Sequence, residues 1–170
     1  MPYVYTKNVI QCIKGTRTIQ SEGDKMIQQY EAKGDGDIII KCGAQNMHLH
    51  QVHDLLKQTV WAFDRPEDVI EKSMNHSLCY GVFLKADDRQ IGFARVITDY
   101  TTHYYLCDVV IDTQYRKKGI GKKMLQAILE NKEFDGMLGM LITEEAEGFY
   151  QPYGFRTPDI CFMMKSRKQD

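Results

Sequence analysis

A basic, glycine-containing segment from Arg116 to Lys123 is the part of the sequence best suited to hold an anion. Its eight residues include five lysines or arginines and the two glycines Gly119 and Gly121. Glycine lets backbone N–H groups approach a ligand without a Cβ clash, and the start of a helix carries partial positive charge. Because a strand-like apolar stretch precedes the segment and a helical pattern follows it, the segment predicts a phosphate-binding loop.

Two common phosphate-binding motifs do not fit this segment. A P-loop requires a glycine five residues before its Gly-Lys pair, but Arg116 stands there, and Lys123 replaces the serine or threonine that would hold magnesium. A dinucleotide-binding fingerprint requires a third glycine at the position of Met124. Two alternatives stay open for the lysines: a solvated basic surface without a ligand, or a nucleic-acid contact whose affinity falls steeply with salt.

The elements around the segment predict how it is held. Residue patterns predict strands over 38–40, 78–86, 90–98, 104–111, 137–142 and 160–164, and helices over 48–62, 119–130 and 144–151. A further helix is expected to open at an Asp64 cap with Pro66 in its first turn and to end near Asn75. The continuous apolar run at 137–142 predicts a buried strand. This order predicts a mixed central β-sheet flanked by helices, an α+β (α/β) fold in a single domain.

The first 36 residues differ from the rest of the chain. They are polar and end in the breaker run at 33–37, which predicts a boundary. We therefore expect an N-terminal extension over 1–36, a domain over 37–165 and a C-terminal tail over 166–170. Apolar residues within 3–13 could form short strands, and residues 24–32 could form a short helix.

Composition narrows the choice of partners and location. The 22 basic and 23 acidic residues leave a net charge of -1, which predicts neither a nucleic-acid nor a membrane partner. Five scattered cysteines without a C-x-x-C pair predict reduced thiols in a cytoplasmic protein. The chain shows neither the apolar core of a signal peptide nor a run of the roughly 20 apolar residues that a membrane helix needs. No cysteine or carboxylate set completes His48, His50 and His53, so no metal is expected.

The loop and a second segment resemble a known superfamily. Arg116, Gly119 and Gly121, directly after the predicted strand, match the Arg/Gln-x-x-Gly-x-Gly/Ala pattern of the GCN5-related N-acetyltransferase (GNAT) superfamily. Residues 146–155 resemble its late motif, a helix with a tyrosine followed by an aromatic-Gly-Phe turn. Similarities to a small bacterial subgroup extend over about residues 37–165 and include Trp61, Arg65-Pro66, and the segments 75–81, 91–96 and 106–110. The resemblance implies the GNAT fold and acetyl-CoA as cosubstrate.

The resemblance also implies which residues bind acetyl-CoA. The backbone of Val109, Val110 and Ile111 would pair with the pantetheine arm as an added strand would, and an N–H there would polarise the thioester carbonyl. The pyrophosphate would lie on the loop that follows, with its charge met by nearby lysines and arginine. The residues expected in this loop are Arg116, Lys117, Lys118, Gly119, Ile120, Gly121 and Lys122.

Two side chains are candidates for proton transfer. Tyr150 takes the place of the superfamily tyrosine that points at the sulfur of coenzyme A, so it would protonate the departing thiolate; a core aromatic is the alternative. Asp108 interrupts an apolar strand, so burial would raise its pKa toward the range of a general base. The alternative for Asp108 is a structural carboxylate that caps backbone groups at a strand irregularity.

These features together predict an N-acetyltransferase that passes the acetyl group of acetyl-CoA to a primary amine by direct attack. The amine could belong to a small molecule or a protein, and a non-catalytic CoA-binding sensor is the alternative. A homodimer is an option by resemblance. Where the subgroup has Arg-Asp-Ala-His-Gly, this chain has the acidic segment 144–148, which could select a cationic acceptor. Cys107 could carry an acyl group, and the residues that could line the acceptor side are Trp61, Phe63, Arg65, Tyr80, Arg95, Tyr100 and His103.

Overall fold

A computed structural model describes residues 29–30, 37–159 and 161–165. The strands form one sheet in the order β1-β2-β3-β4-β5-β6, in which all neighbours are antiparallel except the parallel pair β5 and β6. The mixed sheet predicted from the sequence is confirmed. The strands are β1 (Gln29–Tyr30), β2 (Ile38–Cys42), β3 (Leu78–Leu84), β4 (Gln90–Thr98), β5 (His103–Ile111) and β6 (Leu138–Leu141).

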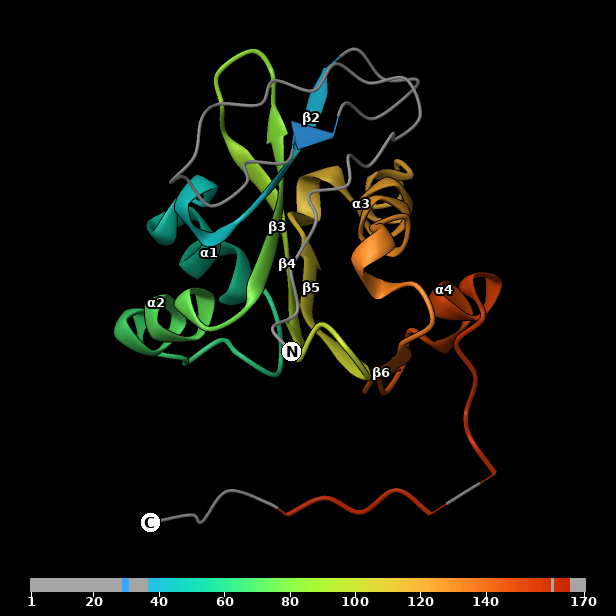
Figure 1. Ribbon diagram of the computed structural model, residues 1–170. Helices are drawn as coiled ribbons and strands as arrows, with labels where there is room; N and C mark the ends of the chain where they lie inside the picture. The colour runs from blue at the N-terminus through green and yellow to red at the C-terminus, as the bar shows by residue number, and fades with distance from the viewer. Residues whose placement is uncertain (1–28, 31–36, 160, 166–170) are drawn as a thin grey trace, which may run out of the picture.

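Helices cover both faces of the sheet (Figure 1). Helices α1 (Leu49–Leu56) and α2 (Glu67–Asn75) lie on one face, and α3 (Ile120–Leu129) and α4 (Glu147–Tyr150) lie on the other. Each pair packs its apolar stripe onto the sheet, which gives two clusters of buried residues, one per face. Within the described part of the chain, no helix has the length and apolarity needed to cross a membrane.

β5 contains one residue more than the part of β4 that it pairs with. Phe93 lies opposite Val110 and Arg95 lies opposite Cys107, so two residues of β5 face one residue of β4. Such an arrangement is a β-bulge, which bends the strand and re-aims its side chains. The bulge contains Asp108, whose φ of 54° lies in the left-handed region that L side chains rarely adopt.

The bulge shifts the alternation of side chains along β5, so that even-numbered residues face one side of the sheet before it and the other side after it. Before it, Leu106 packs into the cluster beneath α3; after it, Val110 packs into the cluster beneath α1 and α2. β5 and β6 also pair only over four residues, from His103 with Leu138 to Leu106 with Leu141. Beyond Leu106, no described strand pairs with the β6 side of β5, so this edge has no strand partner over the last five residues of β5. The Ile111 carbonyl accepts a hydrogen bond from Arg116 Nε.

Several predicted boundaries of the helices and of β6 differ from the structure. The helix predicted over 48–62 ends at Leu56, where the Thr59 hydroxyl donates to the Leu56 carbonyl and closes the last turn. α2 begins after Pro66, which is its N-cap residue, so the predicted Asp64 cap is wrong. β6 is half-exposed and not buried, because it lies at the edge of the sheet. α4 begins at Glu147, three residues later than predicted.

The predictions for the two chain ends have different outcomes. The last strand, predicted over 160–164, is not formed by residues 161–165, which are exposed and extend away from the body after α4 (Figure 1). A strand needs a neighbour that accepts its backbone hydrogen bonds, and no described strand lies beside this segment. Gln29–Tyr30 pairs with β2 as a strand, so the helix predicted over 24–32 is wrong at these two residues. Residues 24–28 and 31–32 and the strands predicted within 3–13 lie outside the described residues.

Candidate cofactor and acceptor site

The loop between β5 and α3 is fixed at both of its ends. Asp112 accepts the backbone N–H of Gln114 at 2.9 Å and opens a short 3-10 turn. Arg116 Nε donates to the carbonyl oxygen of Ile111 at 2.9 Å and ties the turn back to the end of β5. The backbone N–H of Thr113 donates to Gln58 Oε1 at 3.0 Å. The two residues are 55 positions apart, and residue patterns did not predict this contact.

Gly119 gives the loop its open cradle. It has a φ of 78°, forms the N-cap of α3, and has no heavy atom within 4 Å of the position where a Cβ would stand. Lys117 also has positive φ, at 61°. The first N–H groups of a helix have no acceptor within the helix, and the helix dipole adds positive charge there. The backbone around Gly119 is therefore shaped to receive an anionic group.

Cationic side chains surround the cradle. The side chains of Arg116, Lys117, Lys118 and Lys122 are exposed. Lys118 Nζ lies 5.0 Å from the centre of the Tyr115 ring, and the guanidinium of Arg89 lies 5.2 Å from it. Arg89 also donates to the Tyr115 hydroxyl. Sequence reasoning missed Arg89, because its place beside the loop depends on the pairing of β3, β4 and β5 and leaves no local signal.

The free edge of β5 leads into this cradle. Val109 and Ile111 are half-buried beneath α3, whereas the Val110 side chain is 4% exposed in the opposite cluster. The Ile120 side chain is 6% exposed. Val110 and Ile120 could thus contact a ligand mainly through their backbones, as the resemblance implies for Val110. The structure places the predicted strand residues and loop residues in one continuous path from the bulge to the start of α3.

Asp108 forms a buried ion triad with two arginines. Its Oδ2 lies 2.7 Å from Arg65 Nη1 and 2.7 Å from Arg95 Nε. The Asp108 side chain is 4% exposed, and the arginine side chains are 15% and 11% exposed. Arg95 Nη1 also donates to the Ser77 hydroxyl at 3.1 Å, beyond the end of α2. The triad joins the loop before α2, β4 and the bulge of β5.

The triad reverses the pKa shift predicted for Asp108. Burial alone would raise its pKa, but the hydrogen bond and charge of Arg65 and the charge and hydrogen bond of Arg95 outweigh burial and lower the pKa below its usual value. A carboxylate with a lowered pKa holds its two guanidinium groups firmly and accepts a proton poorly near neutral pH. The expectation of a raised pKa is wrong. The geometry favours a structural role for Asp108, with two arginine side chains as partners in place of the backbone groups expected from the sequence.

Tyr150 is held as a neutral phenol beside the start of α3. Its ring makes edge contacts with Phe149 and Phe155, with centroids 4.9 and 6.0 Å apart. It shares a buried cluster with Ile120, against which Val109 also packs. Burial raises the pKa of the Tyr150 hydroxyl to about 12, so at neutral pH the hydroxyl keeps a proton that it could donate.

The predicted acceptor-side residues separate into groups. Tyr80 is fully buried on the α3 side and its hydroxyl accepts from Asn131 Nδ2 at 3.1 Å, so it is not on the acceptor side. Tyr100 is exposed at the turn after β4, and His103 begins β5.

Burial raises the pKa of the Cys107 thiol to about 11, which disfavours the thiolate that an acyl carrier needs. Within the described residues, no group of three or more His, Cys, Asp or Glu could hold a metal ion.

The aromatic residues of the loop between α1 and α2 stay exposed. Trp61 is 56% exposed and Phe63 is 61% exposed. Arg65 at the end of this loop reaches Asp108, and Gln58 at its start reaches Thr113. The structure therefore places Trp61 and Phe63 on a loop that is anchored to Asp108 in β5 and to Thr113 in the turn after β5.

Comparison with known proteins gives a consistent result. The model of the acetyltransferase (GNAT) domain family matches residues 78–157. A candidate acetyltransferase of the GNAT family from Xanthomonas campestris pv. campestris is 34% identical over 74% of this chain and 89% of its own, with a TM-score of 0.69. An aminoglycoside N-acetyltransferase solved with CoA has the same fold, at 18% identity over 79% of this chain and 98% of its own, with a TM-score of 0.61.

A candidate acetyltransferase from Gibberella zeae is 26% identical over 113 residues, which are 56% of this chain. The chain spans 64% of the length of that curated relative. The family match covers the bulge, the cradle and Tyr150, and the Xanthomonas similarity extends to most of the chain. The chain belongs to the GNAT family of acetyltransferases.

Proposed function

We propose that this protein transfers the acetyl group of acetyl-CoA to a primary amine. The observation that carries the proposal is the free edge of β5 after Leu106, which runs into the basic cradle at Gly119. An extended amide chain can pair with an unpaired strand edge, and a pyrophosphate suits a helix start. The relative solved with CoA supports this choice of cosubstrate.

In this proposal the backbone holds most of the cosubstrate. Along Val109, Val110 and Ile111, the unpaired strand edge offers backbone groups to the pantetheine arm, apart from the Ile111 carbonyl, which accepts from Arg116 Nε. Gly119 leaves room for the pyrophosphate, and the N–H groups from Gly119 to Lys122 lie at the helix start. Arg116, Lys117, Lys118 and Lys122 supply the positive charge, to which the structure adds Arg89.

The chemistry requires one bond to form, one bond to break and two protons to move. The neutral amine nitrogen bonds to the thioester carbonyl carbon, the carbon–sulfur bond breaks, and the products are an amide and CoA. Tyr150 donates its phenolic proton to the departing sulfur, and the proton lost by the amine restores the phenol through solvent. Asp108 acts as a positioning residue that holds the bulge, because its carboxylate is bound by Arg65 and Arg95.

Tyr150→Phe tests the role of the phenol. The variant keeps the ring contacts with Phe149 and Phe155 and removes only the donor. We expect kcat to fall about 100-fold, the lower end of the range for a positioned acid, while the Kd for acetyl-CoA changes less than threefold. Thiol release gives kcat, and isothermal titration calorimetry gives the Kd.

Tyr153→Phe is the matched control, since Tyr153 lies on the next turn and its hydroxyl donates to the Lys122 carbonyl at 3.4 Å. Equal turnover in the wild type and Tyr150→Phe would show that Tyr150 is only a core aromatic. Binding of acetyl-CoA by the wild type with no thiol release from any amine would favour the non-catalytic sensor.

The proposal also includes a cytoplasmic location and a homodimer. The four described cysteines are free thiols, which supports a reducing compartment. For the dimer, β6 is a free sheet edge, and the extended segment 161–165 carries the exposed residues Phe162, Met163 and Met164. An apolar extended segment and an exposed edge favour strand pairing, here between two copies.

Cys161 permits a direct test of this pairing. Leu138→Cys places a thiol on the edge strand, and mild oxidation should then give a covalent dimer through Cys161 of a second copy. Adding Cys161→Ser should abolish it. A disulfide within one chain, or a monomer in analytical ultracentrifugation at the same concentration, would contradict the dimer.

A further inference from the structure

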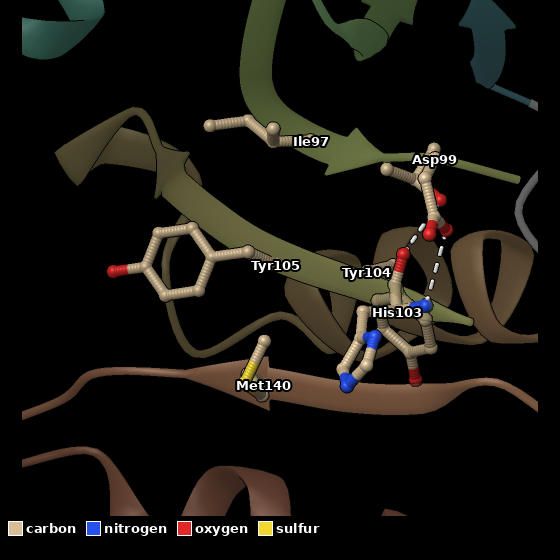
Figure 2. A pocket seen from close by; sticks show the side chains of 7 residues that line it. Ile97, Asp99, His103, Tyr104, Tyr105 and Met140 are labelled. Carbon is tan, nitrogen blue, oxygen red and sulfur yellow. Dashed lines mark hydrogen bonds between the residues drawn. The ribbon is translucent and has the colours of Figure 1, made fainter. Parts of the chain in front are cut away.

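An open cavity of about 260 Å³ lies at the end of the sheet where β4, β5 and β6 meet. Figure 2 shows Ile97, Tyr105 and Met140 along one part of it and the residues of the β4–β5 turn at the other. Ile97 pairs with Tyr105, and Tyr105 pairs with Met140, so the three occupy one row across three strands. Directly paired residues point to the same face, so their side chains form one apolar surface.

This row lies on the face of the sheet that carries the ion triad. Arg95 and Ile97 are two residues apart on β4, and side chains two apart on a strand share a face. Arg95 contacts Asp108 and the Ser77 hydroxyl at the end of α2. The row therefore begins about 7 Å along the strands from the triad, on the α2 side of the sheet.

The carboxylate that lines the cavity is already engaged, and the lining His103 contacts the Thr102 hydroxyl through Nδ1 at 2.6 Å. Asp99 Oδ1 accepts the backbone N–H groups of Thr101, Thr102 and His103 at 3.0, 2.8 and 3.2 Å. Its Oδ2 accepts the Thr102 hydroxyl at 2.6 Å. These hydrogen bonds lower the pKa of Asp99 and hold its carboxylate in the turn. The cavity thus offers apolar contact and little free charge to a ligand.

A second apolar surface is carried by a loop that is anchored at the bulge. The loop 58–65 is anchored by Gln58 to Thr113 and by Arg65 to Asp108. Between these anchors the exposed apolar side chains are Val60, Trp61 and Phe63, of which Val60 is 82% exposed, and Asp64 is exposed beside them. Large apolar side chains that are held exposed beside a reaction site indicate a binding surface.

We infer that the acceptor is a primary amine on an apolar, aromatic-sized body, whose ring binds against Ile97, Tyr105 and Met140. This inference rests on the proposed acetyl transfer at the bulge. The body would bind on the α2 face, with its amine directed along β5 toward the free edge. The acidic segment 144–148, from which a cationic acceptor was predicted, does not line the cavity.

The test compares 2-phenylethylamine with spermidine and ethylamine as acceptors, by thiol release from acetyl-CoA. We expect kcat/KM for 2-phenylethylamine to exceed that for either other amine at least tenfold. Met140→Glu should lower it at least tenfold, mainly through KM. Leu138→Glu is the matched control, because Leu138 lies on the same strand and face but does not line the cavity.

A binding readout separates this inference from the proposed function. Isothermal titration calorimetry with 2-phenylethylamine in the absence of acetyl-CoA measures binding directly. Binding that is lost in Met140→Glu, without thiol release from any amine, would support the cavity and overturn acetyl transfer. A wild type that acetylates spermidine tenfold better than 2-phenylethylamine would overturn the inference and leave acetyl transfer intact. Equal effects of Met140→Glu and Leu138→Glu would also overturn it.

Discussion

Gly119→Trp is expected to weaken acetyl-CoA binding at least 100-fold. The indole would project into the space that the structure leaves open around the Gly119 Cβ position, where the pyrophosphate is proposed to lie. A side chain at a φ of 78° also strains the backbone by roughly 1–2 kcal/mol, which would tilt the N–H groups of the loop. Isothermal titration calorimetry with acetyl-CoA measures the loss.

Gly136→Trp is the matched control for this variant. Gly136 has a φ of 79° and also has no heavy atom within 4 Å of its Cβ position, but it precedes β6 and not α3. Both variants carry the same added ring and similar backbone strain. If Gly136→Trp still binds acetyl-CoA and Gly119→Trp does not, the loss is due to the cradle. Similar affinities of the two variants for acetyl-CoA would contradict the predicted phosphate site.

The features predicted well from the sequence are those that depend on residues close together in the chain. The α3 helix follows from its own apolar stripe, and its start follows from Gly119. The hairpin of β3 and β4 follows from two apolar runs around a short polar turn. The loop could be located because glycines and lysines concentrate there, whatever the rest of the chain does. Each of these signals lies within one element or two consecutive elements of the sequence.

The features that the sequence did not predict depend on contacts across long separations. Asp108 was recognised as unusual, but its partners Arg65 and Arg95 lie 43 and 13 residues away, so the sign of its pKa shift was predicted wrongly. Gln58 reaches Thr113 across 55 residues. The end of α1 was overestimated because Val60 continues the apolar stripe although its side chain is exposed. Residue spacing describes one element at a time and carries no information on such pairings.

The bulge connects the fold to the proposed chemistry. Without the extra residue, β5 would keep one face throughout, and Asp108 would point toward the α3 side. With it, Asp108 points toward Arg65 and Arg95, while Val109 packs beneath α3. The positive φ of Asp108 is a local strain that the two ion pairs can offset. The carboxylate thus acts on the reaction through the geometry of the strand edge.

Asp108→Asn is expected to lower the free energy of unfolding at pH 7 by about 3 kcal/mol, because it leaves two buried arginines without their counter-charge. The lowered pKa of Asp108 fixes the pH dependence. A carboxylate with a lower pKa in the folded state contributes stability above its unfolded pKa of about 3.9, and this contribution is lost as the pH falls through the folded pKa. The difference between the wild type and Asp108→Asn should therefore be full at pH 7 and shrink below about pH 4. Urea unfolding at several pH values measures it.

Two further variants decide between a structural carboxylate and a general base. Asp54→Asn removes an exposed carboxylate that lies 3.6 Å from Lys57 and should change stability by less than 1 kcal/mol. The triple variant Arg65→Met/Arg95→Met/Asp108→Leu removes all three charges of the triad, so it should recover most of the stability lost in Asp108→Asn. A base would give a different result: Asp108→Asn would keep its stability and lose turnover by about 10²–10⁴-fold. A structural carboxylate would instead give a loss of stability in Asp108→Asn that the triple variant restores, and Asp108 would then be assigned to holding the bulge. The turnover that the triple variant retains would measure how far acetyl transfer depends on that geometry.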